Sequence, residues 1–587
     1  MSTTNGTDPA TNTGGAPPAK PDSDVVIIGS GFAGSILASI LARNGASVVV
    51  LDAGSHPRFA VGESTTRIAS LRMKIIAERY GVPELKSLAS FEGLHSEVSA
   101  SCGIKDSFGF IYHRENGEQH AEEHLELVVS SFTNPETHLF RQDVDARLHS
   151  IAVSYGARAF SNVRVSDFEF DDQGVTISTQ GGRSWRTRYV IDASGFRSPL
   201  AKKLGLREDP PSMRHHSRSM FTHMVDVGSY DDAVAPRTLG NILPWNKGTL
   251  HHMFPGGWFW VIPFNNHALA RNNLTSVGVT VDPRIHPKPD CSPEEEFRYW
   301  LHRFPSIERQ FSSAAAARDW VSTGRLQYTS SRTVGDRWCL TAHAAGFVDP
   351  LFSRGLTDTL DSIIALGGRL LDALRDDEFR AERFQAVQDA EKARLHNNDN
   401  LVANTFTSFQ DFDLLNAWLR VWITEQFDLN LESVRAYWRL LSTGDRSGVA
   451  RLEEVALRSS DAEFSPANRL YNRANEEILR VERGEQSTQA AARAITKLIT
   501  EADFIPPMLK FRDMSCRSMH LITAKNLAQV LSWARKSAPP HTRDLVIEGV
   551  SAFFKMRMRP GEFNRSQELK HIIAGVPARR AWAKASR

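Results

Sequence analysis

The stretch DVVIIGSGFAGSILASILARNGASVVVLDAG, residues 24–54, decides the fold. A β-branched run is followed by a glycine turn, an apolar segment of helical composition and a second β-branched run that ends in Asp52. This order predicts one β-α-β unit. Gly29, Gly31 and Gly34 have the G-x-G-x-x-G spacing of dinucleotide-binding turns. We therefore expect an α/β fold with a Rossmann-like nucleotide-binding domain.

The three glycines have different physical tasks in such a turn. Gly29 permits the tight turn, Gly31 lets a pyrophosphate approach the backbone, and Gly34 lets helix and strand pack closely. Phe32 and Ala33 then lie in the first helical turn, whose N-terminus faces the phosphates. The acid that ends the second strand is placed to bind a ribose diol. We expect all of these residues to contact a dinucleotide.

Composition limits the possible partners. The chain has 587 residues, of which 41% are hydrophobic and 24% charged, and its formal net charge is +2. This balance gives no reason to expect nucleic acid or an anionic membrane as a partner. The four cysteines lack C-x-x-C spacing, which argues against a disulfide framework and a metal site and suits a reducing cytoplasm. No window approaches the roughly 18 apolar residues of a membrane span.

The chain divides into three predicted parts. Residues 1–22 are rich in Thr, Gly, Pro and Asn and are expected to be a disordered tail. Residues 23–365 are expected to hold the nucleotide-binding domain with an inserted antiparallel β-sheet, to which the strand-like segments 257–264 and 274–282 belong. Residues 366–587 show apolar residues at three-to-four spacing, which predicts a mainly helical C-terminal domain.

Further segments resemble the FAD-binding fold of aromatic hydroxylases. Arg141 matches their Arg-x-x-x-Asp stretch beside the cofactor, Asp192 their second nucleotide-facing turn, and Asp349 their flavin-facing segment. That last segment begins Ala342-His343, where the fold normally has Gly-Asp or Gly-Asn. The resemblance implies FAD as the cofactor. Because no second glycine-rich motif is found for NADPH, a separate flavin reductase is expected to reduce it.

Two more motifs resemble those of flavin-dependent halogenases. They are HPRFAVGEST (residues 56–65), which contains Arg58, Glu63 and Ser64 as expected cofactor contacts, and GWFWVIPF (residues 257–264), which contains W-x-W-x-I-P. The resemblance implies that reduced FAD and O₂ give a C4a-hydroperoxide, which chloride or bromide attacks to form hypohalous acid. The oxidant then travels through the protein to a lysine beside the substrate.

The W-x-W-x-I-P motif is expected to form a wall between flavin and substrate. Trp258, Trp260, Ile262 and Pro263 would line the route of the oxidant, and the two indoles would keep the substrate away from the flavin without offering a competing nucleophile. W-x-W alone would be read as ordinary core of a β-sheet. The other flavoprotein motifs favour the interpretation of this strand as a wall between flavin and substrate.

Lys105 is the predicted catalytic lysine. It precedes the alternating aromatic residues Phe108, Phe110 and Tyr112, as the active-site lysine of the halogenases precedes an aromatic strand. Its amine would bind hypohalous acid or form a haloamine, and burial would lower its pKa. The alternative is a surface lysine on a loop. Lys74 is expected to be a solvated helix residue.

The segment FVDPLFSRGL, residues 347–356, carries the remaining assignments. Ser353 matches the serine that the halogenases place near the lysine, and the backbone N–H groups of Arg354 and Gly355 are expected to hold a halide at the flavin edge. Phe352 stands where tryptophan-specific members have glutamate. The resemblance therefore favours phenolic, pyrrolic or carrier-tethered substrates over tryptophan.

The sequence thus predicts a cytoplasmic FADH₂-dependent halogenase, an oxidoreductase of antibiotic or other secondary-metabolite biosynthesis. Its general base stays open among Tyr112, His113, Arg114, His251 and His252. Two alternative functions also remain: a single-component FAD-dependent aromatic monooxygenase, and a flavin-binding scaffold without catalysis.

Overall fold

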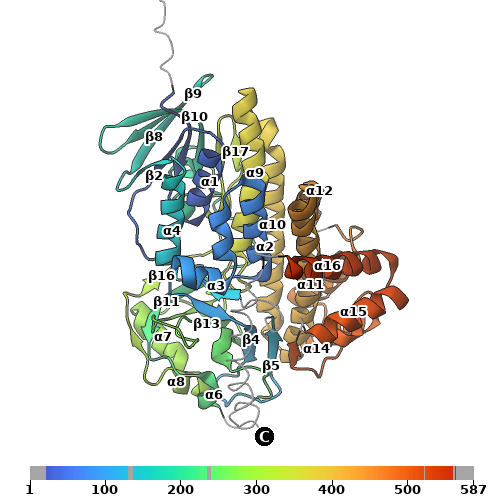
Figure 1. Ribbon diagram of the computed structural model, residues 1–587. Coiled ribbons are helices and arrows are strands. Elements are labelled where there is room, and N and C mark those ends of the chain that lie inside the picture. Colours follow the sequence, from blue (N-terminus) through green and yellow to red (C-terminus); the bar gives the residue numbers. More distant parts are fainter. Residues whose placement is uncertain are drawn as a thin grey trace, which may run out of the picture.

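The computed structural model describes residues 21–129, 136–234, 239–458, 461–520, 523–559 and 562. Residues 1–20 of the predicted tail lie outside the described residues, so that expectation stays a prediction. Figure 1 shows the nucleotide-binding sheet at one end of the molecule, a second sheet below it, and long helices along one side of both.

The nucleotide-binding sheet is mainly parallel, as the glycine-turn stretch predicts. β1 (Ser23–Ile28) pairs in parallel with β2 (Val48–Leu51) and with β10 (Ser184–Asp192). α1 (Phe32–Arg43) connects β1 to β2 and is buried over most of its length. The remaining strands of this sheet are β7 (Arg158–Phe160), β8 (Val165–Asp171), β9 (Gly174–Thr179), β17 (Val334–Gly335) and β18 (Trp338–Leu340).

A second sheet carries the tryptophan strand at its centre. β13 (Gly257–Pro263) pairs antiparallel with β12 (Gly248–Phe254) and β14 (Thr275–Val281). The other members are β4 (Ser107–Tyr112), β5 (His124–Val128), β11 (Arg218–Val225), β15 (Ala315–Ala316), β16 (Val321–Ser322) and β19 (Ser518–His520). The predicted antiparallel order has two exceptions, because β12 is parallel to β4 and β19 is parallel to β5.

A two-stranded sheet lies at the beginning of the aromatic strand. β3 (Gly103–Lys105) pairs antiparallel with β6 (Glu136–His138). Asp106 separates β3 from β4, so Lys105 lies immediately before the strand that carries Phe108 and Phe110. This sheet therefore fixes the backbone of the predicted catalytic lysine.

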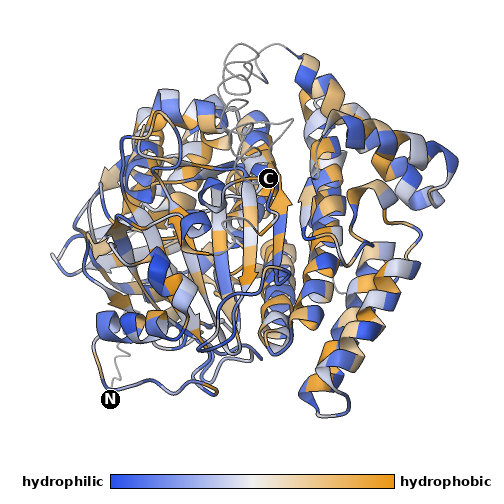
Figure 2. Ribbon diagram, turned by 90° about the horizontal axis from the view of Figure 1, so that it is seen from below, coloured by the Kyte–Doolittle hydropathy of each residue, from blue (hydrophilic) through white to orange (hydrophobic). Residues whose placement is uncertain are grey.

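Long helices make up most of the C-terminal part, and Figure 2 shows apolar and polar residues alternating around them, as in helices that pack by one face. Their bounds are α9 (Gly355–Asp376), α10 (Ala381–Ser408), α11 (Phe412–Thr443), α12 (Ser447–Leu457), α13 (Pro466–Glu482), α14 (Thr488–Glu501), α15 (Ala524–Lys536) and α16 (Pro540–Met558). Helices before α9 include α2 (Arg67–Tyr80), α4 (Arg141–Ser154), α7 (Pro293–His302) and α8 (Pro305–Gln310).

The predicted domain boundary at 365/366 falls inside α9. Packing explains why helix and nucleotide-binding domain are not separate there: α9 contacts α1 and α2, and α11 contacts α2. One hydrophobic core accordingly runs from β1 and α1 to the tryptophans of β13 and on to α16. A smaller core lies on the opposite side of β13, beneath α7 and α8.

Candidate functional site

The glycine turn has the geometry that its three positions require. Gly29 has φ of +96°, and a Cβ there would lie 2.8 Å from the carbonyl oxygen of Ala193. A Cβ at Gly34 would lie only 1.9 Å from the carbonyl oxygen of Gly29, so α1 can approach β1 only with glycine at this position. By contrast, no atom lies within 4 Å of a Cβ at Gly31. The open side of the turn is therefore at Gly31, where a pyrophosphate would approach.

Asp52 ends β2 beside this turn, and its carboxylate is held in place. It accepts hydrogen bonds from Ser30 N at 2.6 Å, Gly54 N at 2.8 Å and Arg58 Nη2 at 2.8 Å. Burial raises the pKa of the Asp52 carboxyl, but the hydrogen bonds from Arg58, Ser30 and Gly54 outweigh burial and lower it overall. Asp52 is thus an anion at the edge where a ribose would lie.

Arg141 closes the other side of the turn. At the start of α4, its guanidinium donates to Asp145 at 2.8 and 2.9 Å and to the carbonyl oxygens of Val61 at 2.7 Å and Gly62 at 3.1 Å. It also lies 5.4 Å from the ring centre of Phe32 in the first turn of α1, which Ala33 continues. Three features together suit the adenosine diphosphate half of FAD: the open N-terminus of α1, the acid at the end of β2 and this arginine.

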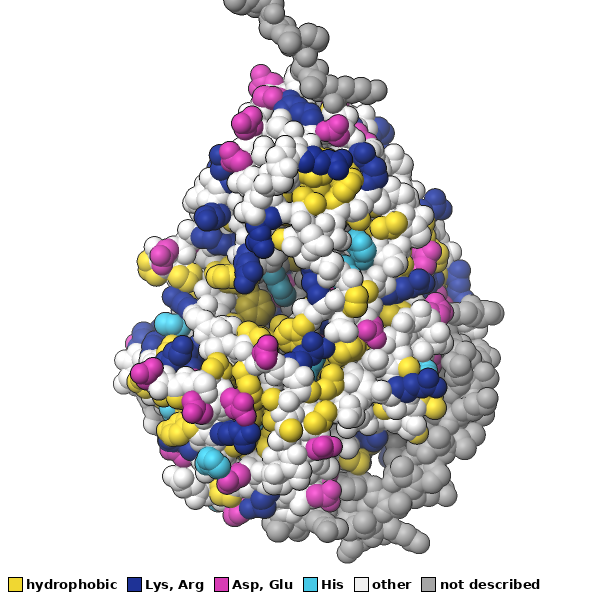
Figure 3. All heavy atoms as spheres, turned by 90° about the vertical axis from the view of Figure 1, so that its left-hand side faces the viewer, with side chains coloured by type: hydrophobic (Ala, Val, Ile, Leu, Met, Phe, Trp, Pro, Cys, Tyr) yellow, Lys and Arg dark blue, Asp and Glu magenta, His cyan; other side chains and the backbone are white. Residues whose placement is uncertain are grey.

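Figure 3 shows a hollow in the face that lies on the left in Figure 1, with hydrophobic side chains in its depth and Lys and Arg near its rim. A cleft of this character suits an apolar ring system joined to phosphates. Among the described residues, no group of three or more His, Cys, Asp or Glu could hold a metal ion. In the same part of the chain, no helix has the length and apolar character needed to cross a membrane.

Two of the acids predicted beside the cofactor hydrogen-bond to the chain. The Asp192 carboxylate is fully buried and accepts from Ser194 and Ser198, both at 2.6 Å, and from Leu200 N at 3.1 Å. Asp349 accepts from Leu351 N in its own turn at 3.1 Å and from Ser217 Oγ, just before β11, at 2.9 Å, and it pairs with His215 Nε2 at 3.1 Å. Both carboxylates thus have partners within the chain.

Glu63 and Ser64, also predicted beside the cofactor, have protein partners as well. Glu63 pairs with His223 at 2.6 Å, and both side chains are buried. Ser64 shares a hydrogen bond with Thr249 at 2.8 Å and accepts one from Lys105 at 2.6 Å. Ser64 thus links the VGEST segment to the predicted catalytic lysine, a contact that sequence reasoning missed.

Lys105 is fully buried, which contradicts the surface alternative. Its Nζ donates to Ser64 Oγ at 2.6 Å and to the carbonyl oxygen of Thr65 at 2.7 Å, and lies 3.4 Å from the centre of the Phe108 ring. Burial lowers the pKa of the Lys105 amine well below its usual value, and Glu136 opposes this shift. The amine therefore lies buried between two oxygen acceptors and an aromatic ring.

The tryptophans of β13 belong to the same side of the sheet as Lys105. Trp258, Trp260 and Ile262 face the main core, whereas Phe259 and Val261 face the smaller one. The two indole rings lie 5.6 Å apart, centre to centre. Pro263 ends the strand. The tryptophans are thus buried, as the core interpretation also requires, and they are buried on the side of the sheet where Lys105 lies.

His251 connects the tryptophans to the lysine. Its ring lies 5.5 Å from that of Trp258, 4.8 Å from that of Phe110 and 5.9 Å from that of Phe108, whose ring contacts Lys105. An unbroken series of aromatic contacts therefore joins Trp260, through Trp258, to the Lys105 amine.

The same geometry narrows the choice of a general base. His113 and His252 bind each other at 2.9 Å and pack beneath α8, on the far side of the sheet from Lys105. Arg114 pairs with Glu123 near the surface, and the hydroxyl of Tyr112 donates to the carbonyl oxygen of Phe409. Among the five candidates, His251 alone lies in the aromatic series that reaches Lys105.

Ser353 lies in a turn before α9 and has φ of +53°, a left-handed conformation that is costly for serine. It makes no hydrogen bond with Lys105 in this structure. Between them lie Phe352 and Trp422, whose ring centres are 4.8 Å apart, and Phe108, 5.8 Å from Trp422. The predicted serine and lysine thus lie on either side of one aromatic cluster.

Arg354 and Gly355 begin α9, where backbone N–H groups have no partner within the helix and favour an anion. The His343 ring covers this end: its Nε2 lies 3.1 Å from the position of a Cβ at Gly355. Burial lowers the pKa of His343 to about 4, and Arg141 adds to the shift. The residue that replaces the usual Asp or Asn is therefore uncharged at neutral pH and lies against the predicted halide position.

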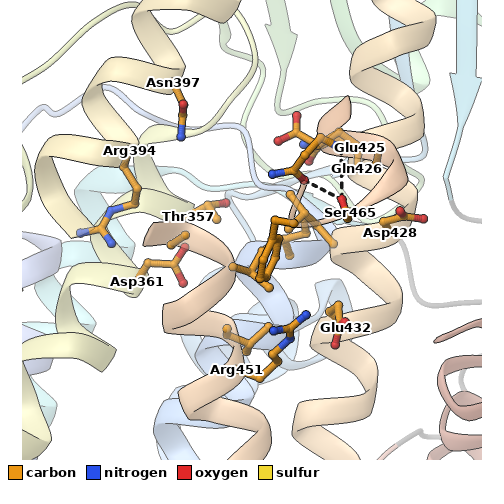
Figure 4. A pocket seen from close by; sticks show the side chains of 18 of the residues that line it. Thr357, Asp361, Arg394, Asn397, Glu425, Gln426, Asp428, Glu432, Arg451 and Ser465 are labelled. Atoms are coloured by element: carbon orange, nitrogen blue, oxygen red, sulfur yellow. Dashed lines mark hydrogen bonds between the residues drawn. The ribbon is translucent and has the colours of Figure 1, made fainter. Parts of the chain in front are cut away.

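Arg354 lines a cavity of about 90 Å³ among the helices, and several charged side chains share its lining. Figure 4 shows Glu425, Asp428 and Glu432 along one wall and Arg394 on another. Thr66, next to the residue whose carbonyl binds Lys105, also lines this cavity. This cavity thus begins within one residue of the lysine site.

A smaller cavity of about 40 Å³ lies on the other side of the α2 N-terminus. Lys74 lines it and lies 3.7 Å from Glu562, so the expectation of a solvated Lys74 is wrong. Helix packing against α11 and α16 covers this face of α2. Glu136 lines the same cavity and was missed by sequence reasoning, because its position opposite Lys105 depends on strand pairing.

Comparisons with known proteins identify the family of the chain. A profile of the FAD binding domain matches residues 22–276. Tetracycline 7-halogenase of Kitasatospora aureofaciens is 44% identical over 542 residues, which cover 92% of this chain and 97% of the relative. Monodechloroaminopyrrolnitrin halogenase PrnC of Pseudomonas fluorescens is 42% identical over 491 residues, covering 83% and 86% of the two chains.

A solved structure shares the same architecture. The crystal structure of halogenase PltM in complex with phloroglucinol and FAD matches with a TM-score of 0.80 and 34% identity, covering 85% of this chain and 99% of PltM. The α/β fold with its FAD-binding domain, inserted sheet and helical C-terminal region is therefore confirmed. The chain belongs to the flavin-dependent halogenases, and its cofactor is FAD.

Proposed function

We propose that this halogenase transfers chlorine or bromine to a free, electron-rich aromatic molecule, and that Lys105 presents the hypohalous acid. One observation carries the proposal: the Lys105 amine is fully buried at the end of the aromatic series that begins at Trp260. An amine in this position can hold an oxidant that has passed the tryptophans, while bulk water is excluded.

The bound reduced FAD would activate O₂, which supplies the oxidising equivalent that turns halide into hypohalous acid. The protein's part begins when the acid reaches Lys105. A ring carbon of the substrate attacks the halogen, the halogen–oxygen bond breaks, and the oxygen takes a proton from the Lys105 ammonium to leave as water. The neutral Lys105 amine, rather than His251 or another of the five candidate bases, then accepts the proton that the substrate ring loses. Lysine returns to its starting state, and only water is released.

The two relatives above 40% identity support a free small-molecule substrate, because their names describe halogenases of tetracycline and of monodechloroaminopyrrolnitrin. The carrier-protein-dependent pyrrole-2-carbonyl chlorinase of Pseudomonas fluorescens is only 28% identical over 377 residues. Phe352 is buried against Trp422 and adds an apolar ring to the lysine site. We therefore favour a phenolic or otherwise activated ring over a carrier-tethered acyl group.

We further propose that Ser353 orients the substrate, that the α9 N-terminus holds the halide, and that a separate flavin reductase of the cytoplasm delivers reduced FAD. The strained conformation of Ser353 and the free backbone donors of a helix start support the first two assignments.

Replacing Lys105 by methionine tests the lysine assignment. With a flavin reductase, bromide and phloroglucinol as the probe phenol, Lys105→Met is expected to lose at least about a hundredfold in product formation, the range of general acid–base effects. Lys74→Met is the matched control, because Lys74 is also largely buried but lies in the neighbouring cavity. Halogenation by Lys105→Met at the rate of the control would remove Lys105 from this function.

A further inference from the structure

The backbone places a carboxylate directly opposite the catalytic lysine. Lys105 and Glu136 are paired residues of the antiparallel strands β3 and β6. Lys105 is fully buried and Glu136 is 6% exposed. Two buried residues of opposite charge at paired positions interact without much screening by water.

Thr65 connects the two side chains. Its carbonyl oxygen accepts from Lys105 Nζ at 2.7 Å, and its hydroxyl lies 3.5 Å from Glu136 Oε2 and 2.9 Å from the carbonyl oxygen of Thr137. Ser70 Oγ donates to Glu136 Oε2 at 2.6 Å. The carboxylate is therefore fixed by α2 and by the segment that holds the lysine.

The surroundings of Lys105 Nζ fit an ammonium group. An ammonium has three N–H donors, and the amine meets three acceptors: Ser64 Oγ, Thr65 O and the face of the Phe108 ring. A neutral amine would direct its lone pair at one of them. The geometry thus indicates a protonated resting state, although burial alone favours the neutral form.

The charges around Lys105 and Glu136 indicate that Glu136 compensates for the effect of burial on the pKa of Lys105. Burial lowers the pKa of Lys105, and Glu136 is the charged side chain that raises it. Burial in turn raises the pKa of Glu136 above its usual value, and Arg67, Lys105 and Lys74 only partly oppose this shift. The other titratable groups facing the pair are His138 and His251 near Lys105, and Tyr437 and Glu562 across the cavity from Glu136.

We propose that Glu136 is a positioning residue that holds Lys105 as an ammonium ion directed at the oxidant. This inference rests on the proposed function of Lys105. When the oxidant arrives, the ammonium N–H that faces the Phe108 ring donates to the hypohalous oxygen instead, and it gives up its proton when the halogen–oxygen bond breaks. Glu136 then favours the return of the proton that the substrate ring releases. Glu136 itself touches neither oxidant nor substrate.

The test is the pH dependence of kcat in Glu136→Gln, measured with FAD, reductase, bromide and phloroglucinol. Glutamine keeps an oxygen acceptor for Ser70 but removes the charge. The pKa of Lys105 then falls further, so the basic limb of the profile is expected to move to lower pH by about one unit. This corresponds to about a tenfold loss of kcat above that limb, with KM unchanged. Glu136→Asp is expected to restore part of the loss.

Glu562→Gln is the matched control, because Glu562 lines the same cavity but acts on Lys74 and Lys86 rather than on Lys105. A pH profile of Glu136→Gln that coincides with this control, or activity that rises at neutral pH, would overturn the inference. Both results are distinguishable from failure of the proposed function, in which Lys105→Met itself keeps its activity.

Discussion

At the scale of single residues, two glycines of the turn have different tasks: Gly34 permits close packing of the fold, and Gly31 leaves room for the cofactor. A methyl group at position 34 would collide with the carbonyl oxygen of Gly29, whereas one at position 31 would meet no atom within 4 Å. We expect Gly34→Ala to lower the free energy of unfolding by about 3 kcal/mol, the upper range for overpacking. Gly31→Ala is expected to change it by less than about 1 kcal/mol.

FAD affinity should respond in the other order. Because Gly31 marks the open side of the turn, Gly31→Ala is expected to weaken FAD binding at least tenfold while the protein stays folded, as the close approach of a pyrophosphate requires. Thermal melting and quenching of flavin fluorescence measure the two effects. Equal FAD affinity for Gly31→Ala and the unmodified protein would show that the phosphates do not pass Gly31.

The site residues that could be predicted from the sequence are those that are recognised by their neighbours in the chain. Lys105 could be predicted because it immediately precedes Phe108 and Phe110 on one chain segment, and the glycines because three of them share one turn. Glu136 could not be predicted, since it faces Lys105 through strand pairing across about 30 residues. Asp192 matched a cofactor motif, but no pattern shows which way a carboxylate turns.

At the scale of elements, β13 and β14 together set the position of the tryptophan wall. Trp260 pairs with Gly278, and a Cβ at Gly278 would lie 2.3 Å from the Trp260 indole. Glycine therefore leaves the space that the indole fills. The alternation of Trp258 and Trp260 with Phe259 was predictable from a period of two, but Gly278 was not, because register is set by the whole sheet.

Gly278→Ala is therefore expected to displace the Trp260 ring, to lower the free energy of unfolding by about 1–3 kcal/mol and to let more oxidant escape. Near-ultraviolet circular dichroism measures the displacement of the Trp260 ring, and a hypohalous-acid scavenger measures the oxidant that escapes. Gly324→Ala is the control, since a Cβ there meets no atom within 4 Å. An unchanged dichroism spectrum in Gly278→Ala would contradict the packing described for the wall.

At the scale of the whole molecule, the C-terminal helical region packs against the part of the chain that holds the candidate site. α9 crosses the domain boundary that was predicted at 365/366 from the spacing of apolar residues. β19 extends the second sheet beside β5. Helical periodicity revealed the region, yet it carried no information on what the helices cover. Their contacts with α2 explain why Lys74 is enclosed rather than solvated.

A fragment that ends at residue 365 is expected not to fold, because it cuts α9 and uncovers α2 and β5. The full chain should melt in one cooperative transition, whereas the fragment should be degraded rapidly in limited proteolysis. A protease-resistant fragment that still binds FAD would contradict this description.

The most direct test of the central claim is a halogen balance in Lys105→Met. With reduced FAD, O₂, bromide, phloroglucinol and an external scavenger, one assay follows flavin oxidation, brominated product and trapped oxidant. If Lys105 receives an oxidant made beyond the tryptophan wall, the variant oxidises flavin at the normal rate, and the bromine that is missing from the product appears on the scavenger. Undiminished bromination of phloroglucinol, with nothing trapped, would contradict the account.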